Sequence, residues 1–455
     1  TVNGDLTLAS GSTYDLELAS NGSSDRTIVS GTAAIDGATV NAIALDKTVS
    51  YAAGQSYTFL SAGSVTGEFG SLLIDSAFID SKLFYTSTDV TLRLSTWGGK
   101  AFTTAAETAN QRAAAAGLDA LNQTAGSASL ALYNAVLFMN EAEARDAFDQ
   151  VSGELHGSVQ SALLSNSRIV SDTVLDRMSA GNTGIWTSGY GAFGQFDGND
   201  NTASYDLNGG GVFFGGDGYV ADNLLLGLMT GWGRSSLDSD GNAGSADIDS
   251  YHVGIYGRTG LGGVSVKAGA AYSFSQVDTE RSLNFGGFSD KLEADYDAGV
   301  TQFFGEASYS LALSETSELA PFVNLSHAIV STDDFSETGG AAALSGEDGD
   351  AQATFTMVGL RASGDFDLAG TALTVDAMAG WRHAFGDLAP EARMTLANGG
   401  SFTVEGAPIG RDAAKVSVGV GLKLSDSADF GVSYHGEFSG EASENKARAD
   451  FTFRF

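Results

Sequence analysis

The sequence predicts a mainly β protein whose C-terminal part, residues 182–455, closes into a twelve-stranded transmembrane β-barrel. Two patterns predict it: alternation with a period of two in segment after segment, and short turns that alternate with long loops. The composition agrees, because the 455 residues include 60 glycines, 3 prolines and no cysteine. Glycine at this level without a Gly-X-Y period, together with 43% hydrophobic residues, excludes collagen and a disordered chain.

The alternation begins at Gly184 and is clearest near the C-terminus. Val416, Val418, Val420, Leu422 and Leu424 fall on one face of a strand, and lysine, serine and glycine fall between them. A soluble antiparallel sheet can alternate in the same way, so the connections decide between the two. We predict twelve strands, with cores at 184–197, 204–218, 222–237, 246–260, 263–279, 293–313, 319–333, 353–368, 371–386, 412–425, 428–439 and 446–455.

The predicted connections after even-numbered strands are very short, as in Leu261-Gly262, Ala369-Gly370 and Asp426-Ser427. Those after odd-numbered strands are mostly longer, as in Glu280 to Leu292 and Asp387 to Arg411. This asymmetry is typical of outer-membrane barrels, and closure removes the strand edges that hydrocarbon cannot solvate. A soluble all-β adhesin is the disfavoured alternative.

Hydropathy and charge limit the other classes. The chain has no run of 18 apolar residues, which excludes an α-helical membrane span. The mean hydropathy near zero fits strands that alternate lipid-facing with lumen-facing residues. A net charge of −33 makes nucleic acid an unfavourable partner. The absence of cysteine excludes disulfides and thiolate metal sites.

Two further regions precede the barrel. Residues 1–96 carry short alternating strands separated by turn residues and predict a β-solenoid end with its cap, or a sandwich. Residues 97–181 predict a helical linker, with capping-box spacing at Thr104–Glu107 and Asn140–Glu143. Its last helix, about 154–178, would be about 35 Å long, close to the thickness of a bilayer. No signal peptide opens the sequence at Thr1, so either it was removed or the sequence is a fragment, and the repeat-like pattern at its start favours a fragment.

The polarity of the 154–178 helix forbids lipid contact, so it could cross a membrane only inside a pore. An ordinary surface helix is the alternative. Its charged residues are Arg168, Asp172, Asp176 and Arg177. Strand parity assigns a basic-leaning set of charges to the lumen, because a charge facing lipid is costly. The set is Arg258, Lys267, Glu306, Arg361, Arg382, Lys415, Lys423, Arg448 and Arg454. These residues could pair with Asp172 and Asp176, or be satisfied by water and by each other.

No motif in the sequence indicates an enzyme, and we expect no catalytic, cofactor or metal site. Gly189-Tyr190-Gly191-Ala192-Phe193-Gly194 matches the dinucleotide fingerprint by letter but lies inside an alternating strand. The five histidines are scattered, without the spacing of metal ligands. Two acidic groups, around Asp238–Asp249 and around Asp333–Asp350, lack the spacing of a calcium loop and read better as solvated loops.

The ordered set of motifs resembles the C-terminal part of type V secretion proteins, the autotransporters, over essentially the whole chain. Leu6-Thr7-Leu8 to Tyr14 is similar to the end of their β-helical passengers, and Val151 to His156 followed by Leu175-Asp176-Arg177 is similar to their helical segment. Gly380-Trp381-Arg382-His383 and the terminal Phe453-Arg454-Phe455 look like their barrel landmarks.

The resemblance implies a helix through the pore and a passenger exported to the surface of a Gram-negative cell, with the barrel in the outer membrane. It also implies several partners: outer-membrane lipids and lipopolysaccharide, periplasmic chaperones and the barrel-insertion machinery. We expect the chain itself to be a monomer. That machinery would read the aromatic residues Phe451, Phe453 and Phe455 as an assembly signal. Some relatives cut their passenger at an Asn-Asn step, and here only Asn166 lies in the helix. A plain outer-membrane pore with a periplasmic N-terminal domain, and an adhesin anchored by the barrel, are the alternatives.

Overall fold

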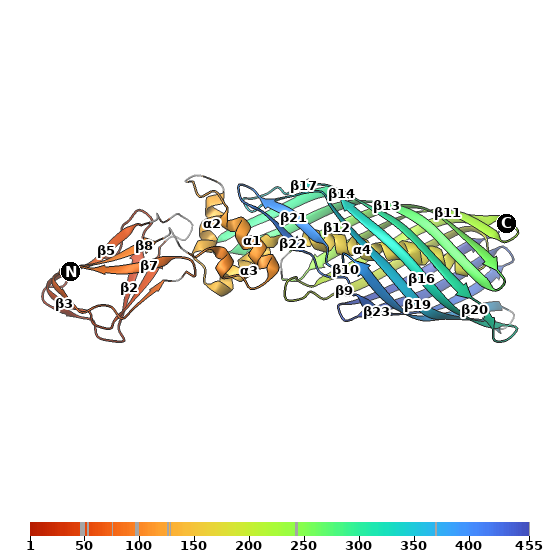
Figure 1. The fold of residues 1–455 in the computed structure, drawn as a ribbon, viewed down its shortest axis with the longest axis horizontal. Coiled ribbons are helices and arrows are strands. Elements are labelled where there is room, and N and C mark those ends of the chain that lie inside the picture. Colours follow the sequence, from red (N-terminus) through yellow and green to blue (C-terminus); the bar gives the residue numbers. More distant parts are fainter. Residues whose placement is uncertain are drawn as a thin grey trace.

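The computed structural model describes residues 1–45, 51, 54–74, 76–95, 100–124, 127, 129–241, 244–368 and 371–454. They form an elongated molecule of three parts in a row (Figure 1): N-terminal strands, a group of helices, and a barrel that encloses one long helix. The predicted Ala369-Gly370 turn and the terminal Phe455 lie outside the described residues.

The N-terminal part consists of two parallel sheets that continue into an antiparallel cap. Its strands are β1 (Leu6–Thr7), β2 (Thr13–Leu18), β3 (Thr27–Ala34), β4 (Thr39–Ala44), β5 (Ser56–Thr66), β6 (Ser71–Ile74), β7 (Asp80–Tyr85) and β8 (Asp89–Ser95). β1, β3 and β5 pair in parallel, and so do β2, β4 and β6, so successive turns of chain stack on one another. β8 pairs antiparallel with β5 and β7. Leu16, Val40 and Phe59 are buried in the interior, and the parallel stacking favours a solenoid over a sandwich.

The helical part contains η1 (Phe102–Thr104), α1 (Ala109–Asp119), α2 (Ser129–Leu137), α3 (Glu141–Ser152) and α4 (Leu155–Ser179). Asn140 caps α3 in a capping box with Glu143, as the sequence predicts. The helix start predicted at Thr104 is wrong. Thr104 ends a 3₁₀ turn, and the capping box that starts α1 is Thr108 with Gln111. Among the described residues, no helix has both the length and the hydropathy to cross a membrane by itself.

The barrel is a closed antiparallel sheet of twelve strands, which confirms the predicted fold class. They are β9 (Gly184–Phe196), β10 (Tyr205–Ala221), β11 (Leu224–Ser239), β12 (Gly244–Leu261), β13 (Val264–Phe285), β14 (Phe288–Tyr309), β16 (Ser317–Thr332), β19 (Gly349–Leu368), β20 (Thr371–Gly386), β23 (Asp412–Ser425), β24 (Ala428–Ser439) and β25 (Ala442–Phe453). The first and last strands pair along their length, with Gly189 opposite Ala449, so the sheet has no free edge. A two-residue strand, β15 (Leu311–Ala312), lies beside β16.

The side of the barrel with the long connections carries additional structure. The predicted loop Glu280 to Leu292 is instead a strand hairpin, because β13 and β14 run on to the pair Phe285 and Phe288. The two longest connections contribute β17 (Phe335–Ser336), β18 (Leu344–Gly346), β21 (Glu391–Leu396) and β22 (Ser401–Glu405), which form a separate four-stranded sheet. Helices α1 to α3, which we call the lid, lie at this end of the barrel (Figure 1).

The outer face of the barrel is apolar, and the inner face carries polar side chains together with a patch of buried apolar ones. Ile255 is 60% exposed and Val323 is 50% exposed, on positions that point away from the lumen. Trp232, Tyr251 and Phe274 are register neighbours on three adjacent strands, so they form a row of exposed aromatic rings. An outward apolar band with an aromatic row near its edge is the surface that a bilayer requires.

Candidate functional site: the barrel lumen and its plug helix

Helix α4 runs through the barrel, and we call it the plug helix. It begins at Leu155 beside the lid and ends at Ser179 beside the short turns. Its first turn fits close to a long connection: a Cβ on Gly157 would lie 2.7 Å from the backbone nitrogen of Gly406, directly after β22. A cavity of about 30 Å³, room for about one water, lies beside Asn166 and Tyr190. Most side chains of α4 are buried, so the helix occupies the lumen in close contact with its surroundings.

One face of the plug helix is apolar. Ile169, Val170, Val174 and Met178 are buried against aromatic and aliphatic side chains of the β9 to β14 wall. The wall residues of this cluster are Trp186, Phe213, Leu225, Met229, Tyr256, Ala271 and Phe304. This contact is a small hydrophobic core inside the barrel. The helical residues in it lie on one side of the helix because of the period of 3.6 residues per turn.

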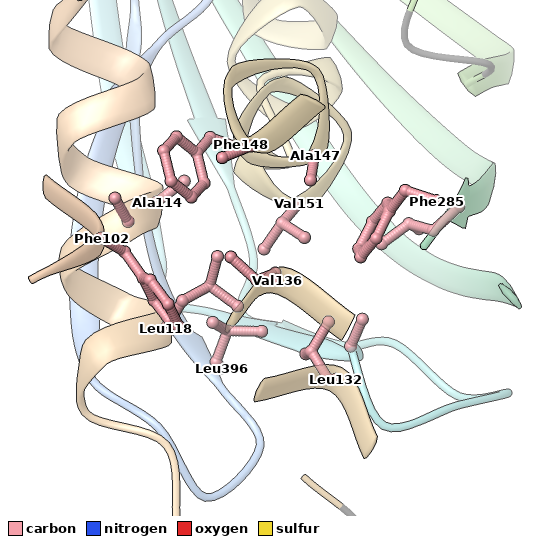
Figure 2. Close-up of a cluster of buried hydrophobic side chains, with 14 of the residues drawn as sticks. Phe102, Ala114, Leu118, Leu132, Val136, Ala147, Phe148, Val151, Phe285 and Leu396 are labelled. Carbon is pink, nitrogen blue, oxygen red and sulfur yellow. The ribbon is translucent and has the colours of Figure 1, made fainter. Parts of the chain in front are cut away.

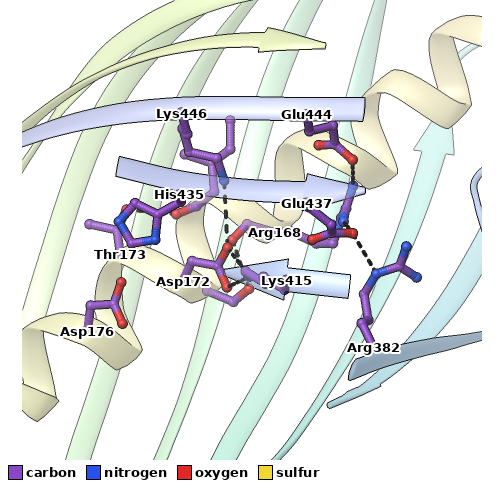
Figure 3. Close-up of polar contacts among 12 residues, drawn as sticks. Arg168, Asp172, Thr173, Asp176, Arg382, Lys415, His435, Glu437, Glu444 and Lys446 are labelled. Carbon is purple, nitrogen blue, oxygen red and sulfur yellow. Dashed lines mark hydrogen bonds and ion pairs between the residues drawn. The ribbon is translucent and has the colours of Figure 1, made fainter. Parts of the chain in front are cut away.

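The opposite face carries ion pairs with the last strands (Figure 3). Arg168 bonds both Glu437 of β24 and Glu444 of β25, and the Nε of Arg382 lies 2.6 Å from Glu437. Arg168, Arg382 and Glu437 are all more than nine-tenths buried. The guanidinium groups of both arginines also lie over the ring of Phe355, at 5.3 and 5.5 Å from its centroid. In the buried lumen each charge needs such a partner.

The two aspartates of the plug helix pair with cations of the same wall. Asp172 accepts a hydrogen bond of 2.6 Å from Lys415, and Lys446 lies 3.6 Å away. Asp176 lies 3.0 Å from Arg448 and 3.9 Å from Arg361.

The end of the plug helix nearest the short turns is fixed by a second network. Arg177 bonds both oxygens of Asp217 at 2.8 Å, and Asp217 also accepts from the hydroxyl of Tyr256 at 2.8 Å. Arg258 donates to the carbonyl of Met178 at 2.6 Å.

Lys267 joins the helix end to the wall. Its Nζ lies 2.5 Å from the Ser179 hydroxyl and 2.6 Å from Glu306, which also pairs with Arg361 at 3.0 Å. The remaining two predicted lumen cations lie at the rim. Lys423 pairs with the exposed Asp426 of a turn, and Arg454 pairs with Asp429. Neither of these two contacts the plug helix in any interaction seen among the described residues.

Carboxylates line the lumen together with the predicted cations, so the wall offers partners of both signs. Asp217, Asp376, Glu437, Glu444 and Asp450 were not singled out, although the same strand parity that placed the cations also places these residues inward. The signal that could have found them is the need of each buried cation for a partner.

At the lid end, a polar cluster ties the plug helix to a loop. His156 lies 3.1 Å from Glu337 and stacks on the ring of Phe335. Arg281 of β13 donates two hydrogen bonds to Glu337, at 2.7 and 2.8 Å. Burial alone would raise the pKa of Glu337, but Arg281 and His156 outweigh it and hold this pKa below its ordinary value.

The lid itself is held by a hydrophobic core that it shares with the barrel loops (Figure 2). Leu118, Val136, Phe148 and Val151 of the lid gather with Leu396 of β21. Phe285, from the tip of the β13–β14 hairpin, also belongs to this core. The mouth of the barrel is therefore covered by packed helices.

The other sequence candidates are placed as follows. Phe451 and Phe453 point outward from β25, 39% and 47% exposed, and Phe455 lies outside the described residues. The glycine-rich stretch Gly189–Gly194 lies within β9. No group of three or more His, Cys, Asp or Glu suited to a metal occurs among the described residues. In the first acidic group, Asp247 pairs with Arg234 at 3.0 Å.

A closed barrel with an apolar outer band and a plugged lumen defines an outer-membrane transport domain. The particular family follows from the sequence profile of the Autotransporter beta-domain, which matches residues 185–435. The chain belongs to the autotransporter family, and its barrel is a translocator domain of the outer membrane.

Relatives and a solved structure agree with this assignment. Over 504 aligned positions the chain is 30% identical to an extracellular serine protease of Serratia marcescens, covering 98% of this chain and 48% of the relative. A second S. marcescens protein with the same name is 28% identical with the same coverage. The chain thus spans about half the length of the curated relatives it matches. The fold is similar to the translocator domain of the autotransporter NalP from Neisseria meningitidis, with a TM-score of 0.54, 17% identity, and coverage of 66% of this chain and 98% of that chain. The translocator fold is non-enzymatic, and the protease name is that of the relatives.

Proposed function

We propose that this chain exports its N-terminal region, residues 1–153, to the cell surface and stays anchored by its barrel, with the plug helix left in the pore. One observation carries the proposal: the chain crosses the closed barrel through α4. Residues before Leu155 lie at the long-connection end, and Ser179 leads to β9 at the short-turn end. In an outer-membrane barrel the long loops face outward and the short turns face the periplasm.

Protease accessibility on intact cells tests the proposal. A tag fused near Thr1 should be removed by added protease, while the barrel core stays intact. A tag inserted at Asp222–Asn223, the turn between β10 and β11, is the matched control and should be cut only after the outer membrane is opened. A Thr1 tag that survives on intact cells would refute export and would favour a plain pore with a periplasmic N-terminal domain.

The expected partners belong to the same proposal. The outward band would contact outer-membrane lipids and lipopolysaccharide, and periplasmic chaperones would hold the chain before insertion. The exposed rings of Phe451 and Phe453, with Phe455, would be read by the insertion machinery. Replacing Phe451 and Phe453 by serine should lower the amount of heat-modifiable barrel in the membrane, and an unchanged amount would contradict the assembly signal. The closed sheet supports a monomer, because it leaves no strand edge for a second copy.

The activity of the whole passenger is a separate question. The names of the curated relatives favour a secreted serine protease over the alternative of an adhesin anchored by the barrel. A fluorophosphonate probe, which labels activated serines, should react with the surface-exposed full-length protein if this is correct. Absence of labelling together with adhesion of the cells would favour the adhesin.

A further inference from the structure

The charged residues of the plug helix follow the same spacing as their partners on the last strand. Arg168, Asp172 and Asp176 are four residues apart, so they lie on one helical face. Their partners on β25 are Glu444, Lys446 and Arg448, two residues apart on the lumen face. The signs are opposite in all three pairs: Arg168 faces Glu444, Asp172 faces Lys446, and Asp176 faces Arg448. The first two pairs are drawn in Figure 3.

The two spacings are also close in length. Four helical residues rise about 6.0 Å. Two strand residues span about 6.8 Å, or about 5.2 Å along the barrel axis at a tilt of about 40°. Helix and strand therefore stay in step over all three pairs, and both run from the lid end toward the short turns.

A slip of one helical turn would break this match in either direction. Toward the lid, Asp172 would take the place of Arg168 and face Glu437 and Glu444. Toward the short turns, Arg168 would take the place of Asp172 and face Lys415 and Lys446. Either slip brings like charges together in a buried space, where charges without a partner are strongly unfavourable.

The apolar face of the helix distinguishes the registers less sharply. Ile169, Val170, Val174 and Met178 pack against a patch of wall side chains. After a slip of one turn in either direction, two of these four places hold an apolar residue again and two hold a polar one. Hydrophobic contacts are non-directional and this exchange brings no like charges together, so the apolar face holds the helix in the lumen and sets its height less strictly than the charges do.

We infer that the sequence of charges Arg168, Asp172, Asp176 is a positional code that sets the register at which the exported chain stops in the pore. The inference rests on the proposed export function and assigns these three residues and their wall partners as positioning residues. They select the one register at which the chain comes to rest with the lid outside and Arg177 at Asp217.

The register can be measured by thiol cross-linking, because the chain has no cysteine of its own. Asn166 lies 3.0 Å from Ser235 of β11 across the lumen, so Asn166→Cys with Ser235→Cys reports the native register. Val170→Cys with Ser235→Cys reports a slip of one turn toward the lid, and Ala162→Cys with Ser235→Cys reports the opposite slip. Cross-links are made in isolated outer membranes with a short bifunctional thiol reagent.

The decisive variant exchanges the charges, Arg168→Asp with Asp172→Arg. In the native register both new side chains would face like charges. After a slip of one turn toward the lid, the arginine introduced at position 172 would face Glu437 and Glu444. The same slip would bring Asp176 to Lys415 and Lys446. It would also separate Arg177 from Asp217, so every cross-linking variant carries Arg177→Met with Asp217→Asn, and in that background the slip should be preferred. We expect the ratio of slipped to native cross-link to rise by at least about tenfold, the effect of about 1.4 kcal/mol. Adding Glu444→Lys with Lys446→Glu to β25 should move the ratio back.

The matched control exchanges an exposed pair in a turn, Lys423→Asp with Asp426→Lys, and should leave the ratio unchanged. A charge exchange that leaves the native cross-link dominant would overturn the inference. If the exchanged protein does not reach the membrane, Asp172→Met decides instead. It leaves Lys415 and Lys446 without a partner in the native register, and it removes the clash with Glu437 and Glu444 that forbids the slip toward the lid. That slip brings Asp176 to the two lysines, so the Val170–Ser235 cross-link should rise, and no rise would overturn the inference. The Thr1 tag assay separates the two ideas: a tag that is never exposed refutes export, whatever register the cross-links report.

Discussion

Replacing Glu337 by glutamine should open the loop that closes over the plug helix. Glu337 is 7% exposed and accepts hydrogen bonds from two nitrogens of Arg281 and from the backbone of Leu344. His156 is its fourth contact. Glutamine keeps the shape but removes the charge, so the guanidinium of Arg281, itself 3% exposed, is left buried without a counter-charge.

Breaking a buried ion pair by removing one partner costs about 3–5 kcal/mol. The loop between β16 and β19 should therefore populate its open state about 10² to 5 × 10³ times more often, up to the limit of its local stability. Hydrogen exchange of peptides covering residues 333–348, with the protein in detergent or nanodiscs, measures this directly. Asp334→Asn removes an exposed carboxylate from the same loop and is the matched control. Equal protection in Glu337→Gln and Asp334→Asn would refute the reasoning.

Three other predictions follow from the same structure. The pKa of Glu337 is lower in the folded protein than in the unfolded chain. Its contribution to the stability of the loop is therefore fully present above the ordinary glutamate pKa of about 4.3 and is lost as the pH falls below that value. Pepsin should then cut the 333–348 loop faster with falling pH, and Glu337→Gln should flatten that dependence. Gly227→Val should reduce assembly of heat-modifiable barrel, because a Cβ there would lie 2.3 Å from a tyrosine ring, whereas Gly218→Ala, with nothing within 4 Å, should be silent. Phe148→Ala, at a fully buried position, should destabilise the lid by about 3–5 kcal/mol, so that trypsin releases lid fragments while the barrel persists; lid cleavage at the wild-type rate would contradict this.

The barrel could be predicted from sequence because lipid on one side and a largely charged lumen on the other impose a strict period of two. Residues 416–424 show this rule without interruption. The pattern of apolar outward residues weakens beyond the bilayer, which explains why the β13–β14 hairpin at Glu280 to Leu292 was predicted as a loop. There the outward side chains, such as Glu280, meet water, and the inward ones, such as Leu283 and Leu292, are buried where the barrel meets the lid. Such a segment looks like a loop until the lid that covers it is known.

The lumen could be predicted only in part. Parity places single residues such as Lys415 and Arg448 on the inner face, but it cannot tell which residues across the barrel face each other. The contacts of Arg168 with Glu437 and Glu444 join residues far apart in the chain, so they depend on the height of the helix in the pore. Thr108 with Gln111 has the same capping-box spacing as Thr104 with Glu107, so the spacing alone does not tell which of the two starts the helix.

The shared core of lid and loops has a practical consequence for surface display. Leu118 and Phe148 pack with Leu396, so the helices and the loops behave as one module even though the family profile begins only at residue 185. A foreign protein joined directly to Leu155 would leave those loop residues uncovered in water. A foreign protein joined upstream of Phe102 would keep the lid, which would continue to cover those loop residues. The useful fusion junction is therefore set by where the hydrophobic core ends, well before the membrane domain starts.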